Sequence, residues 1–101
     1  MARWKFGDIA DVNVGMDDAD FWIIRRGSID RVGEPVREYS PEAYGIKIKE
    51  EYLDRVLPQY MFYAMMHVWQ QGYYRNLATG STRLVNIRSR DIESIPISPM
   101  E

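Results

Sequence analysis

One apolar segment constrains the fold of this chain more than any other feature. From Tyr60 to Trp69 nearly every residue is apolar or aromatic, and the apolar side chains recur at helical spacing. Pro58 suits the first position of a helix, where its missing N–H costs nothing, and Gly72 is a natural C-terminal stop. The sequence therefore predicts a main helix over about 58–71, buried inside the domain or against a partner. The side chains expected on its apolar stripe are Met61, Phe62, Met65, Met66, Val68 and Trp69.

Short segments of β-forming residues lie on both sides of this helix. Alternation predicts half-buried strands at 10–14 and 44–49, and a run of β-formers predicts a third strand at 21–27. After the helix, 83–87 has β character, and 91–99 predicts a short turn leading into an edge strand, because its two prolines exclude a central position. The predicted fold class is α+β, a single domain with a small mixed or antiparallel sheet packed on one buried main helix.

The composition excludes several classes of protein. The chain contains no cysteine, so disulfides, thiol chemistry and sulfur-based zinc sites are excluded. No apolar run approaches the ~20 residues of a membrane span, and the N-terminus lacks the apolar core of a signal peptide. The segment 11–17 fails as a calcium loop, because its glycine is one position early and Trp22 stands where a bidentate Glu is needed. We therefore expect a cytoplasmic protein that needs no metal or cofactor and does not enter a membrane.

The charge is distributed unevenly along the chain. The net charge is −2, which alone speaks against nucleic acid. The segment 55–90, however, contains no acidic residue, and every cation in it is arginine, the side chain suited to bidentate contacts with phosphate or guanine. Pairing of these arginines with nearby carboxylates is the alternative, and the sequence leaves both open. The arginines of this segment are Arg55, Arg75, Arg83, Arg88 and Arg90.

Catalytic patterns are absent from the sequence. His67, the only histidine, lies within the apolar helix, and no serine has an evident base as its partner. A nuclease-like cluster of Glu34 and Glu50 with Lys47 or Lys49 is conceivable, but short patterns of this kind match often by accident. We therefore expect a protein that is not an enzyme.

Four motifs stand in a fixed order in the second half of the chain. P-Q-Y opens the apolar helix, G-S-T follows at 80–82, L-V-N-I at 84–87 and D-I-E-S-I-P-I-S-P at 91–99. In this order and spacing, they resemble the end of a target recognition domain from the DNA specificity subunits of type I restriction–modification enzymes. The segment from Trp4 to Ala10 also resembles the opening strand and turn of that family, so the chain is similar to a reduced domain of this kind.

The resemblance implies a non-catalytic module that reads a short site in double-stranded DNA. Methyltransferase and restriction subunits are the implied partners, and a single copy would need to form a homodimer or borrow a partner. The variable loops of the family help to read DNA, which points to Arg25, Arg26 and Arg31 as candidates. From the residues alone, the small hydroxyl side chains around Gly80, flanked by arginines, suit a phosphate. The candidates of this second group are Arg75, Thr79, Ser81, Thr82, Arg83, Arg88 and Arg90.

Each group has a structural alternative that the sequence leaves open. The segment 25–37 also reads as a surface loop of mixed charge, and 79–82 as a tight structural loop. A protein-interaction module that does not bind DNA is therefore the second interpretation, and the net charge of −2 favours it. Salt separates the two, because DNA binding weakens steeply as salt rises.

Overall fold

The computed structural model describes residues 4–80 and 84–97 of the chain. It confirms the predicted α+β class: antiparallel sheets surround one core, and the radius of gyration of 12.9 Å is that of a compact domain of about 100 residues. The helices are α1 (Phe6–Ile9), α2 (Pro58–Gln70) and α3 (Ser89–Glu93), with a 3-10 turn, η1, at Glu50–Tyr52. The strands are β1 (Trp4–Lys5), β2 (Ala10–Val14), β3 (Phe21–Ile23), β4 (Arg26–Gly27), β5 (Pro35–Val36), β6 (Tyr44–Ile48), β7 (Thr79–Gly80), β8 (Val85–Asn86) and β9 (Pro96–Ile97).

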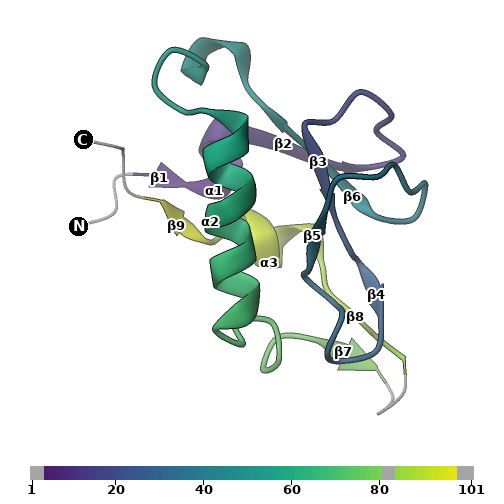
Figure 1. Ribbon diagram of the computed structural model, residues 1–101. Coiled ribbons are helices and arrows are strands. Elements are labelled where there is room, and N and C mark those ends of the chain that lie inside the picture. Colours follow the sequence, from purple (N-terminus) through teal and green to yellow (C-terminus); the bar gives the residue numbers. More distant parts are fainter. Residues whose placement is uncertain (1–3, 81–83, 98–101) are drawn as a thin grey trace.

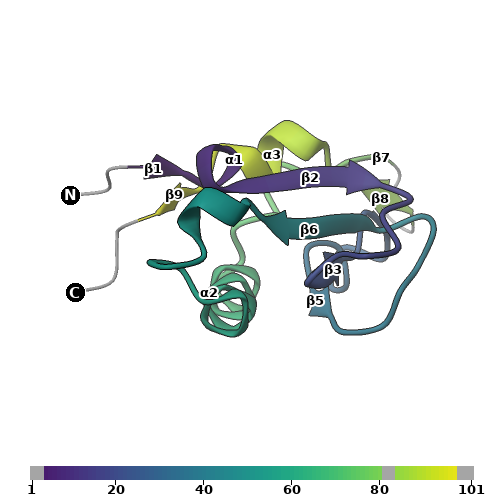
Figure 2. The same cartoon turned by 90° about the horizontal axis from the view of Figure 1, so that it is seen from above.

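The described strands form three antiparallel sheets rather than one. The largest has the order β2-β6-β3-β5, and the smaller ones are β1-β9 and β4-β8-β7. Figure 1 shows α2 standing between the β1–β9 pair and the other two sheets. In Figure 2, α1 and α3 lie beside β2, and α2 lies on the far side of β6 from them. The core cluster combines buried residues of α2 with buried residues of β2, β3 and β6.

The main helix has the predicted bounds to within one residue. The extended backbone of Leu57 precedes Pro58 at the first helical position, and Gly72 takes φ of +80° just after the helix ends. Met61, Phe62 and Met65 are buried, and the Phe62 ring meets Phe21 of β3 edge to face at 5.5 Å. The opposite side of α2 is not covered by the described residues: Tyr60 is 45% exposed and Tyr63 is 55% exposed.

Two segments differ from the sequence prediction. The run 21–27, predicted as one strand, is divided into β3 and β4, because the chain leaves the main sheet after Ile23 and pairs with β8 instead. The run 91–97 was predicted as a turn and an edge strand, but its first residues complete the helix α3. The edge strand itself is present as β9, where Pro96 lies opposite Lys5 of β1.

Among the described residues, no helix is both long and apolar enough to cross a membrane.

Candidate nucleic-acid interface

The three-stranded sheet β4-β8-β7 brings together residues from both candidate groups. Arg26 of β4 lies opposite Asn86 of β8, and Asn86 lies opposite Thr79 of β7. Residues that are directly opposite on neighbouring strands share one face of a sheet. We call these three positions the outer row. The outer row thus joins β4, which precedes the main helix in the chain, to β7 and β8, which follow it.

The alternation of β8 fixes which face the outer row occupies. Val85 and Ile87 are buried in the core, so Asn86 between them stands on the other face. Arg26 and Asn86 are both exposed. Arg26 and Asn86 therefore occupy the exposed face of a narrow antiparallel ribbon.

This arrangement matches the chemistry of base reading in DNA. Arginine forms bidentate hydrogen bonds with guanine, and asparagine forms them with adenine. A narrow β-ribbon fits the major groove, and several DNA-binding proteins use strands in this way. Asn86 was not among the candidates from the sequence. The alternation of L-V-N-I, with apolar residues on both sides of the asparagine, is the signal that identifies it.

Arg25 does not share this face. It is half-buried, its Nε donates a hydrogen bond of 2.8 Å to the Glu42 carbonyl oxygen, and its guanidinium lies 6.0 Å from the centre of the Tyr44 ring. Its own carbonyl accepts from the N–H of Ile87, which extends the pairing of β4 with β8. Arg25 therefore holds the ribbon against β6, and the structure does not group it with Arg26.

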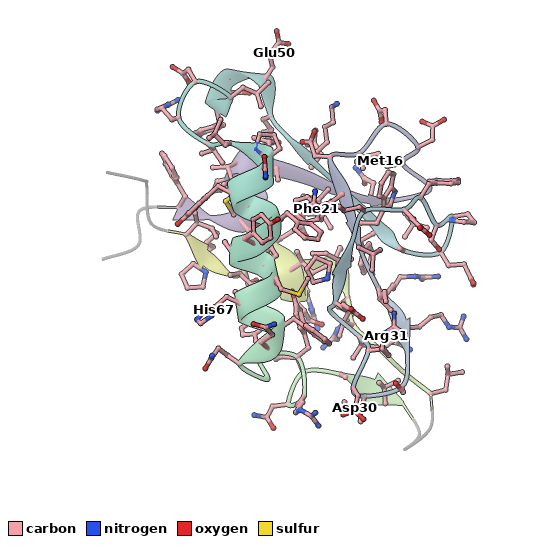
Figure 3. The ribbon with its side chains drawn as sticks, viewed as in Figure 1. Met16, Phe21, Asp30, Arg31, Glu50 and His67 are labelled. Carbon is pink, nitrogen blue, oxygen red and sulfur yellow. The ribbon has the colours of Figure 1, made fainter. Side chains whose placement is uncertain are left out.

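Arg31 and Arg75 each form an ion pair with a carboxylate of the turn between β4 and β5. Arg31 pairs with Glu34, and the Arg75 guanidinium lies 2.7 Å from Asp30. Figure 3 shows Asp30 and Arg31 at the same end of the molecule as β4, β7 and β8 in Figure 1. Both arginine side chains remain more than half exposed, and an exposed ion pair contributes at most about 1 kcal/mol. A phosphate can therefore replace either carboxylate as a partner at low cost.

The remaining candidates lie at the start of α3, on α3 or outside the described residues. Arg88 precedes α3: its N–H donates to the Asp91 carboxylate at 2.8 Å, and its Nε lies 3.8 Å from the same group. Arg90 is exposed on α3 itself. The sequence candidates Ser81, Thr82 and Arg83 lie outside the described residues. The expected alternative for the arginines of 55–90, pairing with carboxylates, thus applies to Arg55 (with Asp54), Arg75 and Arg88.

Two tyrosine hydroxyls fix the segment that carries Asn86 and Arg88 to the core, and a third tyrosine hydroxyl is buried nearby. The Tyr44 hydroxyl donates to the Ile87 carbonyl at 3.2 Å, and the Tyr73 hydroxyl donates to the Asp91 carbonyl at 3.0 Å. The Tyr74 hydroxyl is buried and has no hydrogen-bond partner among the described residues. Burial raises the pKa of all three hydroxyls; for Tyr44 the nearby Arg25 guanidinium opposes this effect, and for Tyr74 the shift is the largest.

Tyr74 should make the fold sensitive to alkali. The unfolded chain ionises this hydroxyl above pH 10, whereas the folded chain keeps it protonated to a higher pH. Stability is therefore unaffected below pH 10 and falls above it, by up to about 1.4 kcal/mol per pH unit. Urea denaturation of the parent and of Tyr74→Phe between pH 9 and 11 measures the difference. The variant should lose less stability, and equal slopes for the two proteins would contradict this.

The nuclease-like set from the sequence is not assembled. Glu50 is exposed at one end of the molecule, and Asp30 and Arg31, next to Glu34, are at the other end (Figure 3). His67 lies on the side of α2 that faces away from Arg31 in the same view. Within 4–80 and 84–97, no group of three or more His, Asp or Glu side chains is arranged to hold a metal ion.

Comparison with protein-family models, with curated proteins and with solved structures finds no match for this chain. The resemblance to target recognition domains therefore depends on the sequence motifs alone.

Proposed function

We propose that this chain is a DNA-binding module that reads a short double-stranded site through the outer row of its β4-β8-β7 ribbon. The observation that carries the proposal is the register that places Arg26 opposite Asn86 on the exposed face of this ribbon. Two of the four motifs, G-S-T and L-V-N-I, contribute Gly80 to β7 and Val85–Asn86 to β8. Two of the motifs behind the resemblance therefore contribute strands to this ribbon, and the other two lie in α2 and in α3 with β9.

In this proposal, the two kinds of contact are divided among different arginines. Arg26 and Asn86 meet base edges and give sequence preference. Arg31, Arg75, Arg88 and Arg90 meet phosphates and position the ribbon, which adds affinity without preference. The module does not cut or methylate DNA. It acts in the cytoplasm as the targeting part of a type I-like restriction–modification system, with methyltransferase and restriction subunits as its partners.

The proposal is tested by selecting duplexes from a randomised pool and measuring binding by fluorescence anisotropy at several salt concentrations. Arg26→Ala should weaken binding to a selected duplex by about tenfold or more, with little change for a scrambled duplex. Arg75→Ala should weaken both duplexes alike and reduce the slope of log K against log salt by about 0.9. Arg26→Ala is thus expected to lose sequence preference, and Arg75→Ala is expected to lose affinity for all duplexes alike.

Arg55→Ala is the matched control for charge. Arg55 lies over the Tyr52 ring at 4.9 Å, beside η1, and η1 lies at the opposite end of the molecule from the ribbon (Figure 1). Its removal should leave both affinity and salt slope unchanged. If the folded parent protein bound no duplex even at low salt, the DNA-binding proposal would fail for this chain.

The alternative function is a protein-interaction module that does not touch DNA. The observation that favours it is the exposed aromatic side of α2, together with the net charge of −2.

A further inference from the structure

A cavity lies between the C-terminal end of α2 and the turn that joins β4 to β5. It has a volume of about 380 Å³, at the lower end of the roughly 300–1,000 Å³ that is typical of ligand sites. In Figure 1 the chain leaves the lower end of α2 and passes toward β7, beside this turn. We call it the α2-end cavity, and its lining includes Ile29, Val32, Trp69, Gln70, Tyr74 and Arg75.

The local backbone explains why a cavity forms at this place. Gly72 takes φ of +80° just after α2 and turns the chain back, so that Tyr74 lies in the core at 2% exposure. Val32 is buried on the other side of the cavity, in the turn between β4 and β5. The ion pair of Arg75 with Asp30 joins the two sides.

The walls combine aromatic rings, branched aliphatic side chains and one cation. Trp69 and Tyr74 supply the rings, and Ile29 and Val32 supply the aliphatic groups. Such walls favour a flat aromatic ligand. Arg75 is the only charged residue among the described residues of the lining. It therefore favours an anion and disfavours the cation that aromatic rings alone would attract.

The Arg75 guanidinium has donors left for a ligand. Its Nη2 donates to the Asp30 carboxylate at 2.7 Å, but a guanidinium has five N–H donors in all. The side chain folds back over Gly72, another lining residue, because its Nε lies 4.0 Å from the point that a Cβ on Gly72 would occupy. One cation already beside one carboxylate accepts a singly charged ligand better than a phosphate monoester, which carries about −1.5 to −2.

Tyr74 adds a second feature of a binding site. Its hydroxyl is buried and has no hydrogen-bond partner among the described residues, although buried polar groups are normally paired. Burial also raises the pKa of this hydroxyl. A cavity that combines apolar walls, a few polar groups and a perturbed titratable residue has the features of a small-molecule site.

We propose that the α2-end cavity binds a small, flat aromatic carboxylate, with its ring against Trp69 and its carboxylate on Arg75. Two N–H groups of a guanidinium match the two oxygens of a carboxylate. For a ligand of about 13 non-hydrogen atoms, an ordinary ligand efficiency gives a dissociation constant of about 0.1–1 mM. Binding requires no DNA, so the site and its test are independent of the proposed function.

Titration of the isotope-labelled full chain with indoleacetate, followed by two-dimensional NMR, tests the site. Indoleacetate has the flat ring and the carboxylate, indoleacetamide keeps the ring without the charge, and acetate keeps the charge without the ring. Indoleacetate should shift the backbone amide signals of Val32 and Gly72 and should bind about fivefold more tightly than indoleacetamide, or better. Acetate should not bind detectably below about 10 mM, because it has no ring to bury.

Three substitutions of exposed side chains locate the carboxylate. Arg75→Gln should weaken indoleacetate binding about fivefold or more and change indoleacetamide binding less than about twofold, because only the charged contact is lost. Arg31→Gln is the matched control: it removes the same charge from an exposed pair with Glu34 at the same end of the molecule (Figure 3), but Arg31 does not line the cavity. It should change either affinity less than about twofold. Asp30→Asn should strengthen indoleacetate binding about twofold or more, because it removes the carboxylate that shares Arg75.

Three results would overturn the proposal. The first is the absence of shifts at the cavity residues up to about 10 mM indoleacetate, or shifts confined to other parts of the chain. The second is equal affinity of the parent protein for indoleacetate and indoleacetamide. The third is equal weakening by Arg75→Gln and Arg31→Gln, which would reduce the effect to general surface charge. The spectrum of each variant without ligand shows whether it keeps the parent fold.

Discussion

Replacing Gly33 with alanine is expected to lower the free energy of unfolding by about 2–5 kcal/mol. Gly33 has φ of +90° in the turn between β4 and β5, a backbone conformation that costs an alanine about 1–2 kcal/mol. A methyl group at this position would also overlap the ring of Tyr74. That ring is 2% exposed and packed in the core, so it has little room to move away. Overpacking of this kind costs about 1–3 kcal/mol more.

Gly15→Ala separates the cost of the backbone conformation from the cost of the overlap with Tyr74. Gly15 also has a positive φ, +78°, but nothing lies within 4 Å of the added methyl group. It should cost only the backbone part, about 1–2 kcal/mol. Urea denaturation followed by circular dichroism measures both variants. Equal losses for Gly33→Ala and Gly15→Ala would show that Tyr74 does not confine Gly33.

The contact of Gly33 with Tyr74 also concerns the candidate interface. Gly33 ends the turn that holds Asp30 and Arg31, and Tyr74 precedes Arg75, which pairs with Asp30. The two halves of this end of the molecule are thus joined twice, once by packing and once by an ion pair. If Gly33→Ala disrupts the packing of this turn on Tyr74, it should therefore displace Arg31 and Arg75 together.

Elements with a clear period were predictable from the sequence. The α2 helix follows from its apolar stripe between Pro58 and Gly72, and β2 and β6 follow from their alternation. The other strands have two or three residues each, which is too short to show any period; β3, β8 and β9 lie in segments that β-forming residues or prolines had marked as strands. The five-residue helix α3 was missed for the same reason, although Asp91 caps it through the N–H of Arg88.

The candidate interface was predictable only in its residue types. The arginines and the G-S-T and L-V-N-I motifs are visible in the sequence. The pairing of Arg26 with Asn86, however, joins a segment that precedes α2 in the chain to one that follows it. Such long-range pairing depends on the packing of the whole core. The same holds for Arg75, whose partner Asp30 comes from the other half of the chain. No local pattern distinguishes an arginine that pairs with a carboxylate from one that faces solvent.

The second large effect is expected in α2, where Met65→Ala should cost about 2–5 kcal/mol of unfolding free energy. Met65 is fully buried at the centre of the only long helix in the described part of the chain, and its removal leaves a cavity that the surrounding strands cannot fill. Phe62→Ala should cost a similar amount, because it also loses the edge-to-face contact with Phe21.

Met66→Ala is the matched control, because it makes the same substitution one residue further along at a half-buried position. It should cost less than half as much as Met65→Ala, since fewer contacts are lost. In a domain of this size, 1 kcal/mol corresponds to about 4–8 °C in Tm, so Met65→Ala should lower Tm by at least about 8 °C. If Met65→Ala and Phe62→Ala both melted within a degree of the parent, α2 would not be part of the core. A loss confined to Met65 and Phe62 would instead show that α2 is anchored by its core-facing side alone, with Tyr60 and Tyr63 on its exposed side.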